Sequence, residues 1–122
     1  MANVFVWLEI PVEDIERAAK FYGTVLENEL QIYDDGTRKI ATFPGTEGND
    51  VGGSLTQVDG FKPSSDGPLA YMSAGDDLSE TLKRVETAGG KVVIEKTTMG
   101  DFGYFATFID SEGNTLALFS TS

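Results

Sequence analysis

The sequence contains neither cysteine nor histidine. Without cysteine, the chain forms no disulfide bonds and performs no thiol chemistry. Without histidine, it lacks the side chain that titrates near neutral pH and that commonly binds transition metals. A Ser–His catalytic pair is excluded for the same reason. These two absences remove several common nucleophilic and metal-dependent mechanisms before any motif is considered.

Positive charge is also scarce. Nine Lys and Arg residues stand against 20 Asp and Glu residues, which gives a net charge of −11. A field of this sign repels nucleic-acid phosphates and anionic membrane surfaces, so we expect neither as a partner. No apolar run approaches the roughly 20 residues that span a bilayer, and the first residues lack the basic segment of a signal peptide. We therefore expect a cytoplasmic protein.

A hydrophobic core is well supplied, since 40% of the 122 residues are hydrophobic and eight are Phe. This length and composition predict one folded domain. Within it, the pattern of apolar residues predicts a strand, a helix and three strands, and then the same order again. The predicted strands are 4–10, 29–34, 37–43, 51–57, 69–74, 91–96, 103–109 and 114–120, and the helices begin at Asp14 and Asp77 and end near Asn28 and Ala88.

The two halves share more than their order. Subtracting 63 from the second half aligns both helices: Asp77 with Asp14, Leu78 with Ile15, Leu82 with Ala19, and Val85 with Tyr22. Asp77 and Glu80 also have the spacing of a capping box. The stretch ATFPGTEGND (41–50) is nearly repeated as ATFIDSEGNT (106–115). We interpret these matches as an internal duplication, with chance similarity inside an ordinary α+β domain as the alternative.

WLEIPVEDIERAAKFY in the first half, and GPLAYMSAGDDLSETLKRVETAGGKVV and GYFATFIDSEGNTLAL in the second, resemble the vicinal oxygen chelate superfamily. This superfamily includes glyoxalase I, extradiol dioxygenases, fosfomycin-resistance enzymes and bleomycin-resistance proteins. The resemblance implies an α+β fold of two βαβββ modules that form a half-open barrel around a cavity. Module one would span about 3–57, the linker about 58–68 and module two about 69–120, and the protein would be a homodimer.

Enzymes of this superfamily hold a divalent metal through His, Glu or Gln residues on the first and last strands of each module. Carried over by position, the resemblance assigns these places to Trp7 and Gly52 in module one, and to Ala70 and Ala117 in module two. A shift of one or two residues would bring in Leu69 or Ser54. None of these side chains donates a lone pair to a metal except Ser54, a poor lone ligand. We expect no metal and no other cofactor.

If Trp7 occupies a ligand position, strand alternation turns Glu9 to the same face. A carboxylate beside an indole in a cavity would have a raised pKa, and would act as an acid or base or bind a cationic or hydroxylic ligand. The alternative is a solvated or ion-paired Glu9 at the barrel mouth or dimer contact. Trp7 is itself a candidate ligand contact. Met72, Tyr104 and Phe119 are candidate ligand contacts from module two, with ordinary core packing as their alternative.

These observations favour a metal-free protein that binds or sequesters a small apolar or aromatic molecule. One alternative is a lyase or isomerase that uses Glu9 or an atypical metal site. Another is a structural module for protein–protein contact, with its cavity filled by side chains. The sequence leaves the question of enzymatic activity open.

Overall fold

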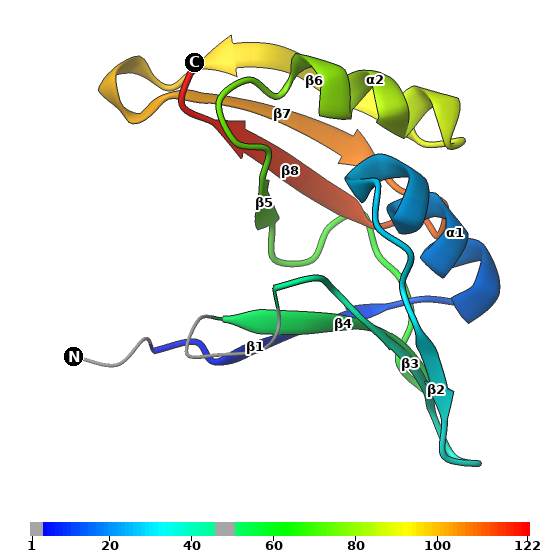
Figure 1. Cartoon of the computed structure of the whole chain (residues 1–122). Helices are drawn as coiled ribbons and strands as arrows, with labels where there is room; N and C mark the ends of the chain where they lie inside the picture. The colour runs from blue at the N-terminus through cyan, green and yellow to red at the C-terminus, as the bar shows by residue number, and fades with distance from the viewer. Residues whose placement is uncertain (1–3, 46–50) are drawn as a thin grey trace.

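The computed structural model describes residues 4–45 and 51–122 as an α+β fold (Figure 1). The first half contains β1 (Trp7–Pro11), α1 (Ile15–Leu26), β2 (Ile32–Asp34), β3 (Lys39–Thr42) and β4 (Gly52–Gln57). The second half contains β5 (Ala70–Ser73), α2 (Ser79–Thr87), β6 (Lys91–Thr98), the 3₁₀ turn η1 (Gly100–Phe102), β7 (Tyr104–Ile109) and β8 (Thr115–Ser120). The predicted order of elements is confirmed.

Each half forms a four-stranded mixed sheet, in the orders β1-β4-β3-β2 and β5-β8-β7-β6. In both, the first strand runs parallel to the last and the other pairs are antiparallel. The sheets lie apart at the end where the chain begins, with α1 near the opposite end (Figure 1). The two halves therefore share the topology that the resemblance implied, and the sheets do not close into a barrel.

Helix α1 forms as its sequence predicts. Asp14 caps it by accepting hydrogen bonds from the backbone N–H groups of Glu16 and Arg17, each at 3.1 Å. The predicted apolar face is buried except for the partly exposed Leu26. At the end of the helix, the N–H of Asn28 donates to the carbonyl of Gly23 at 3.1 Å. Local capping and a 3.6-residue period thus account for this helix.

Helix α2 differs from the prediction. It begins at Ser79, and no side chain caps it, so the capping box of Asp77 and Glu80 is wrong. The Asp77 carboxylate instead accepts from the N–H of Ser79 and from Lys96 Nζ, both at 2.9 Å. These contacts lower the pKa of Asp77, the Ser79 N–H contributing most. The Asp77 side chain thus joins the start of α2 to Lys96 of β6.

Strand β1 begins at Trp7, later than predicted, because its partner β4 begins opposite it at Gly52. The preceding residues Val4 to Val6 are exposed. Strands β2 and β3 also begin two or three residues later than predicted.

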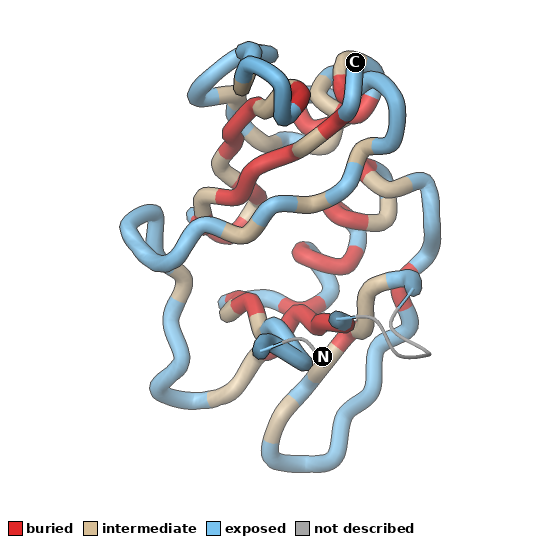
Figure 2. The backbone as a smooth tube through the Cα atoms, turned by 90° about the vertical axis from the view of Figure 1, so that its left-hand side faces the viewer, coloured by how far each residue is buried: buried red, intermediate tan, exposed pale blue. Residues whose placement is uncertain are grey.

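One core joins both halves. Phe21 and Tyr22 of α1 lie in contact with each other, at 4.9 Å between ring centroids. Phe21 also lies 6.3 Å from the ring of Phe108 in β7, and Tyr22 lies 5.5 Å from the ring of Phe43 beside β3. Figure 2 shows the buried segments gathered at the centre of the molecule, on α1 and on strands above and below it. Helix α1 therefore packs against residues of both sheets at one end of the molecule.

Candidate functional site

The first sheet has one face in the core and one face turned away from α1. Ile10, Ala41 and Leu55 belong to the core, so their strand neighbours point to the opposite side. We call that side the outer face of the first sheet; it carries Trp7, Glu9, Gly52, Ser54, Thr56 and Arg38. The strand register places Trp7 opposite Gly52 and Glu9 opposite Ser54. The sequence prediction that Trp7 and Glu9 share a face is consistent with this register.

Glu9 is ion-paired. Nη2 of Arg38 donates to both carboxylate oxygens of Glu9, at 2.8 and 2.9 Å. The side chains of Arg38 and Glu9 are 42% and 34% exposed. The sequence analysis left two possibilities for Glu9, an acid–base role and an ion pair. The structure shows the ion pair. The carboxylate is therefore engaged by a guanidinium rather than free beside the indole.

Next to this ion pair lie an exposed indole and two buried hydroxyls. Trp7 is 44% exposed, whereas Ser54 and Thr56 are almost fully buried. The oxygens of Ser54 and Thr56 lie 3.2 Å apart and share a hydrogen bond. The outer face thus carries an exposed aromatic surface beside an ion pair and a buried pair of hydroxyls.

The strand register shows which residues lie opposite each other at the positions where the resemblance placed metal ligands, and it replaces one of these residues. Trp7 and Gly52 lie opposite each other in the first sheet, but in the second sheet Tyr71 lies opposite Ala117. Ala70, which the sequence placed there, packs against the core instead. Within residues 4–45 and 51–122, no three acidic side chains converge in a way that would hold a metal ion.

The remaining predicted ligand contacts lie in different places. Met72 and Tyr104 pack against the core, and Lys96 Nζ lies 4.8 Å from the ring centroid of Tyr104. Phe119 lies opposite Phe105 and alternates with the buried Leu118, so it points to the outer face of the second sheet. Within one chain, the structure therefore brings Trp7 and Glu9 together but separates them from the other three residues.

Two apolar pockets lie between the first strands of the two modules. One, of about 420 Å³, includes Met72 and Tyr71, and the other, of about 350 Å³, includes Glu9. Both are lined by Leu8, Ile10, Ala70 and Leu116. Trp7, Tyr104 and Phe119 lie outside them. Strands β1 and β5, which contribute residues to the pockets, are edge strands, each paired on one side only within the described chain.

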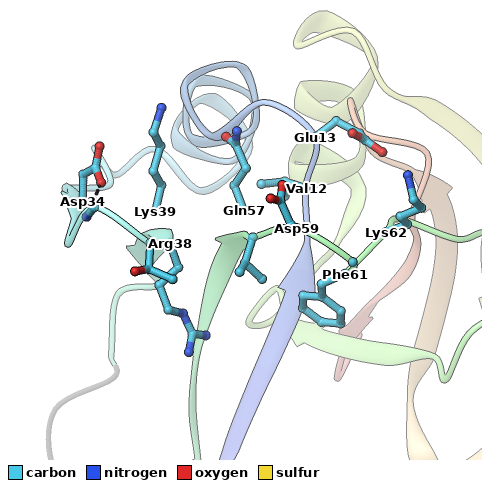
Figure 3. Close-up of a pocket in the computed structure, with 13 residues that line it drawn as sticks. Val12, Glu13, Asp34, Arg38, Lys39, Gln57, Asp59, Phe61 and Lys62 are labelled. Atoms are coloured by element: carbon cyan, nitrogen blue, oxygen red, sulfur yellow. Dashed lines mark hydrogen bonds between the residues drawn. The ribbon is translucent and has the colours of Figure 1, made fainter.

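A polar pocket of about 310 Å³ lies beside the turn between β2 and β3 of the first sheet (Figure 3). It is lined by charges of both signs, including Lys39, Lys62 and Asp59. Figure 3 shows Lys39 and Gln57 pointing to one side of the sheet and the guanidinium of Arg38 pointing to the other. Arg38 therefore borders this pocket but directs its charge to the outer face.

The second copy of the repeated motif contacts module one. The Glu112 carboxylate, which is fully buried, accepts from the backbone N–H groups of Glu13 and Asp14 at 2.9 and 3.0 Å. It also accepts from Arg17 Nε at 2.6 Å and from Nη2 at 2.9 Å. Burial alone would raise the pKa of Glu112, but these donors and Ser111 outweigh it and lower the pKa.

Two neighbours of Glu112 reinforce this contact. Tyr22 donates from its hydroxyl to Asp110 Oδ2 at 2.6 Å, and burial followed by the Asp110 charge raises the pKa of Tyr22 well above its ordinary value. Asn114 Nδ2 donates to the carbonyl of Pro11 at 2.7 Å. We call Asp110, Glu112 and Asn114 the inter-module clamp. The first copy of the motif extends over 46–50, outside the described residues.

Sequence reasoning missed Arg38, Tyr71 and the inter-module clamp. Tyr71 had no clear signal, because both alternating sets of residues in LAYMSA (69–74) are partly apolar. Arg38 had none, because its partner Glu9 lies 29 residues away.

Comparisons with known proteins agree with this architecture. Residues 5–27 match the family model described as bleomycin resistance protein-like N-terminal. A glyoxylase-like domain-containing protein from Didymella fabae is 36% identical over 117 residues, covering 91% of this chain and 88% of that protein.

Two solved structures share the fold at low identity. A glyoxalase/bleomycin resistance protein/dioxygenase family enzyme from Burkholderia phytofirmans PsJN matches with a TM-score of 0.71 and 13% identity, covering 95% of this chain and 97% of that one. A glyoxylase/bleomycin resistance protein/dioxygenase domain from Frankia sp. EAN1pec matches with a TM-score of 0.72 and 18% identity, covering 100% and 93%.

Proposed function

Since the chain belongs to the vicinal oxygen chelate superfamily, we propose that it binds a small apolar or aromatic molecule on the outer face of its first sheet, without a metal ion. One observation carries the proposal: the paired positions at which metal-binding relatives would place ligands hold Trp7 and Gly52. An exposed indole there supports stacking with an apolar ligand instead of metal coordination. Sequestration of a toxic compound is the simplest purpose of such a site.

We further propose that the site is completed by a second copy of the chain. Trp7 and Phe119 point to the outer faces of different sheets, so one cavity that holds both requires the second sheet of another copy. Exposed apolar residues near the free strand edges support such an interface, among them Phe5 at 78%, Tyr71 at 50% and Leu8 at 40% exposed. Patches of this kind on a protein surface often mark protein contacts.

The ion pair with Arg38 weighs against Glu9 as a general base, because a base must be free to take a proton from the substrate. A lyase or isomerase reaction therefore remains the second candidate. It predicts an activity that Glu9→Gln abolishes while ligand binding persists.

Metal analysis of the purified protein, followed by melting curves with and without divalent cations, tests the metal-free proposal. We expect no stoichiometric metal and no metal-dependent shift in the melting temperature. Tightly bound metal at one ion per chain would contradict it.

Ligand binding is tested by titrating a panel of aromatic acids and alcohols while following the fluorescence of Trp7, the only tryptophan. We expect saturable changes for some members of the panel. A panel that leaves both fluorescence and melting temperature unchanged would favour the structural module instead. Sedimentation over a range of concentrations tests the homodimer.

A further inference from the structure

The three arginines of the chain differ in how their Nε atoms are used. Nε of Arg17 donates to Glu112, and Nε of Arg84 donates to the carbonyl of Val25 at 2.9 Å. Nε of Arg38 is buried and has no acceptor within residues 4–45 and 51–122. Buried donors without partners are rare and costly in folded proteins. Arg38 therefore has hydrogen-bonding capacity that the rest of the described chain does not use.

The backbone of Arg38 is held firmly by the turn before β3. The Asp35 carboxylate accepts from the N–H groups of Thr37 and Arg38, at 2.9 and 2.8 Å. The two bonds lower the pKa of Asp35, with the Arg38 N–H as the larger cause. A charged Asp35 thus fixes the start of the Arg38 side chain near neutral pH. The guanidinium is presented to the outer face from a rigid base.

The ion pair leaves part of the guanidinium available. A guanidinium has five N–H donors, and Glu9 engages only Nη2. The side chain remains 42% exposed. Among the residues that the structure describes, Arg38 is also the one Lys or Arg on the outer face of the first sheet, because Lys39 points to the opposite side. An acidic protein thus places a single cation beside an exposed indole.

We infer that Arg38 is the residue that recognises the polar end of the ligand, and that the ligand is an aromatic or apolar carboxylate. The inference rests on the proposed function and names its ligand class. A ligand carboxylate would accept a charge-assisted hydrogen bond from the N–H groups of the guanidinium that Glu9 leaves free. The aromatic part of the ligand then stacks on Trp7, two residues from Glu9 on the same strand face. Glu9 competes with the ligand carboxylate for the guanidinium of Arg38 and does not itself bind the ligand.

The inference is tested with two matched probes, phenylacetate and 2-phenylethanol, which share the aromatic ring but differ in charge. Trp7 fluorescence reports the dissociation constant of each. We expect phenylacetate to bind at least about tenfold more tightly, the range of a charge-assisted hydrogen bond. In Arg38→Gln this preference should be lost. In Glu9→Gln, which frees the guanidinium, phenylacetate should bind more tightly than in the wild type.

Lys39→Gln is the matched control, because it removes the same charge from the neighbouring residue on the other side of the sheet. It should leave the preference for phenylacetate intact. A second readout needs no variant to fold: the ¹⁵N–¹H signal of Arg38 Nε should shift on addition of phenylacetate, whereas that of Arg84 should not.

The outcomes separate the two proposals. Equal binding of both probes, or an unchanged preference in Arg38→Gln, would overturn the role of Arg38 while leaving the binding function standing. Failure of both probes and of the wider aromatic panel would overturn both. A preference lost equally in Lys39→Gln would mean that net charge, rather than Arg38, selects the probe.

Discussion

The two modules share a topology but present different chemistry on their outer faces. The first sheet presents the Glu9–Arg38 ion pair beside Trp7, whereas the second presents the aromatic residues Tyr71 and Phe119. The outer face of the second sheet has no counterpart of the ion pair within the described residues. The two halves therefore share a backbone arrangement but differ in the side chains of their outer faces. A cavity that joins one face of each kind would combine polar recognition with aromatic contact.

The helices of the two modules also differ, in length, capping and burial. Helix α1 has 12 residues, a side-chain cap and six buried residues, whereas α2 has nine residues, no side-chain cap and two buried residues. The inter-module clamp then ties module two to the start of α1. Most of the packing that holds the modules together is thus centred on α1, although both modules contribute to the same core. Four experiments test this unequal division.

The largest expected effect comes from the core. Leu55 in β4 and Leu118 in β8 are each fully buried, one in each module. Truncating either to Ala should lower the free energy of unfolding by about 2–5 kcal/mol, because a cavity is left behind. Since one core joins the modules, each variant should unfold in a single transition in urea. Two separate transitions, with only one of them shifted in each variant, would instead show that the modules fold independently.

The inter-module clamp should have the next largest effect. Glu112→Ala leaves two backbone N–H groups and Arg17 without their acceptor, which should lower the free energy of unfolding by about 1–3 kcal/mol. Urea denaturation measures the change. Glu80→Ala removes an exposed carboxylate that pairs with the exposed Lys83 at 3.5 Å, and should have little effect. Equal losses in both variants would mean that the buried contacts of Glu112 add nothing to those of a surface carboxylate.

The same carboxylate predicts a dependence on pH. Because the pKa of Glu112 is lowered in the folded state, the unfolded chain binds its proton first as the pH falls. Its stabilisation is complete above the ordinary Glu pKa of about 4.3 and is lost as the pH falls through the lower folded value. The stability difference between the wild type and Glu112→Ala should therefore shrink below about pH 4.3. A difference that stays constant down to acid unfolding would contradict this origin.

The sequence predicted α1 and the order of elements because their signals are local. A capping Asp and an apolar stripe lie within one stretch of chain, and the repeat supplied a second copy for comparison. The orientation of β5 is different. Both alternating sets in LAYMSA are partly apolar, so alternation did not show that Tyr71, rather than Ala70, faces outward. Pairing with β8 and packing against the core decide it, and neither is encoded in the strand itself.

The sequence also did not predict contacts between residues that lie far apart in the chain. Glu9 was found as a candidate because of its strand position, but its ion pair depends on a neighbour 29 residues away across β4. Glu112 appeared only within the repeated stretch 106–115, although it contacts Arg17, 95 residues earlier. Sequence spacing identifies residues that share an element, whereas the state of an ionisable side chain is set by what the fold brings next to it.

The smallest expected effect comes from the two helix starts, which the sequence treated as equivalent. Asp14→Ala removes a cap with two hydrogen bonds and should cost about 0.5–2 kcal/mol of stability, as measured by urea denaturation. Asp77→Ala should cost less, because Asp77 lies outside the helix and its ion pair with Lys96 is exposed to solvent. Asp14→Asn is the control for Asp14, since Asn caps helices about as well and should recover most of the loss. If Asp77→Ala proved the more damaging change, α2 rather than α1 would be the helix whose start limits stability, and the asymmetry between the modules would be reversed.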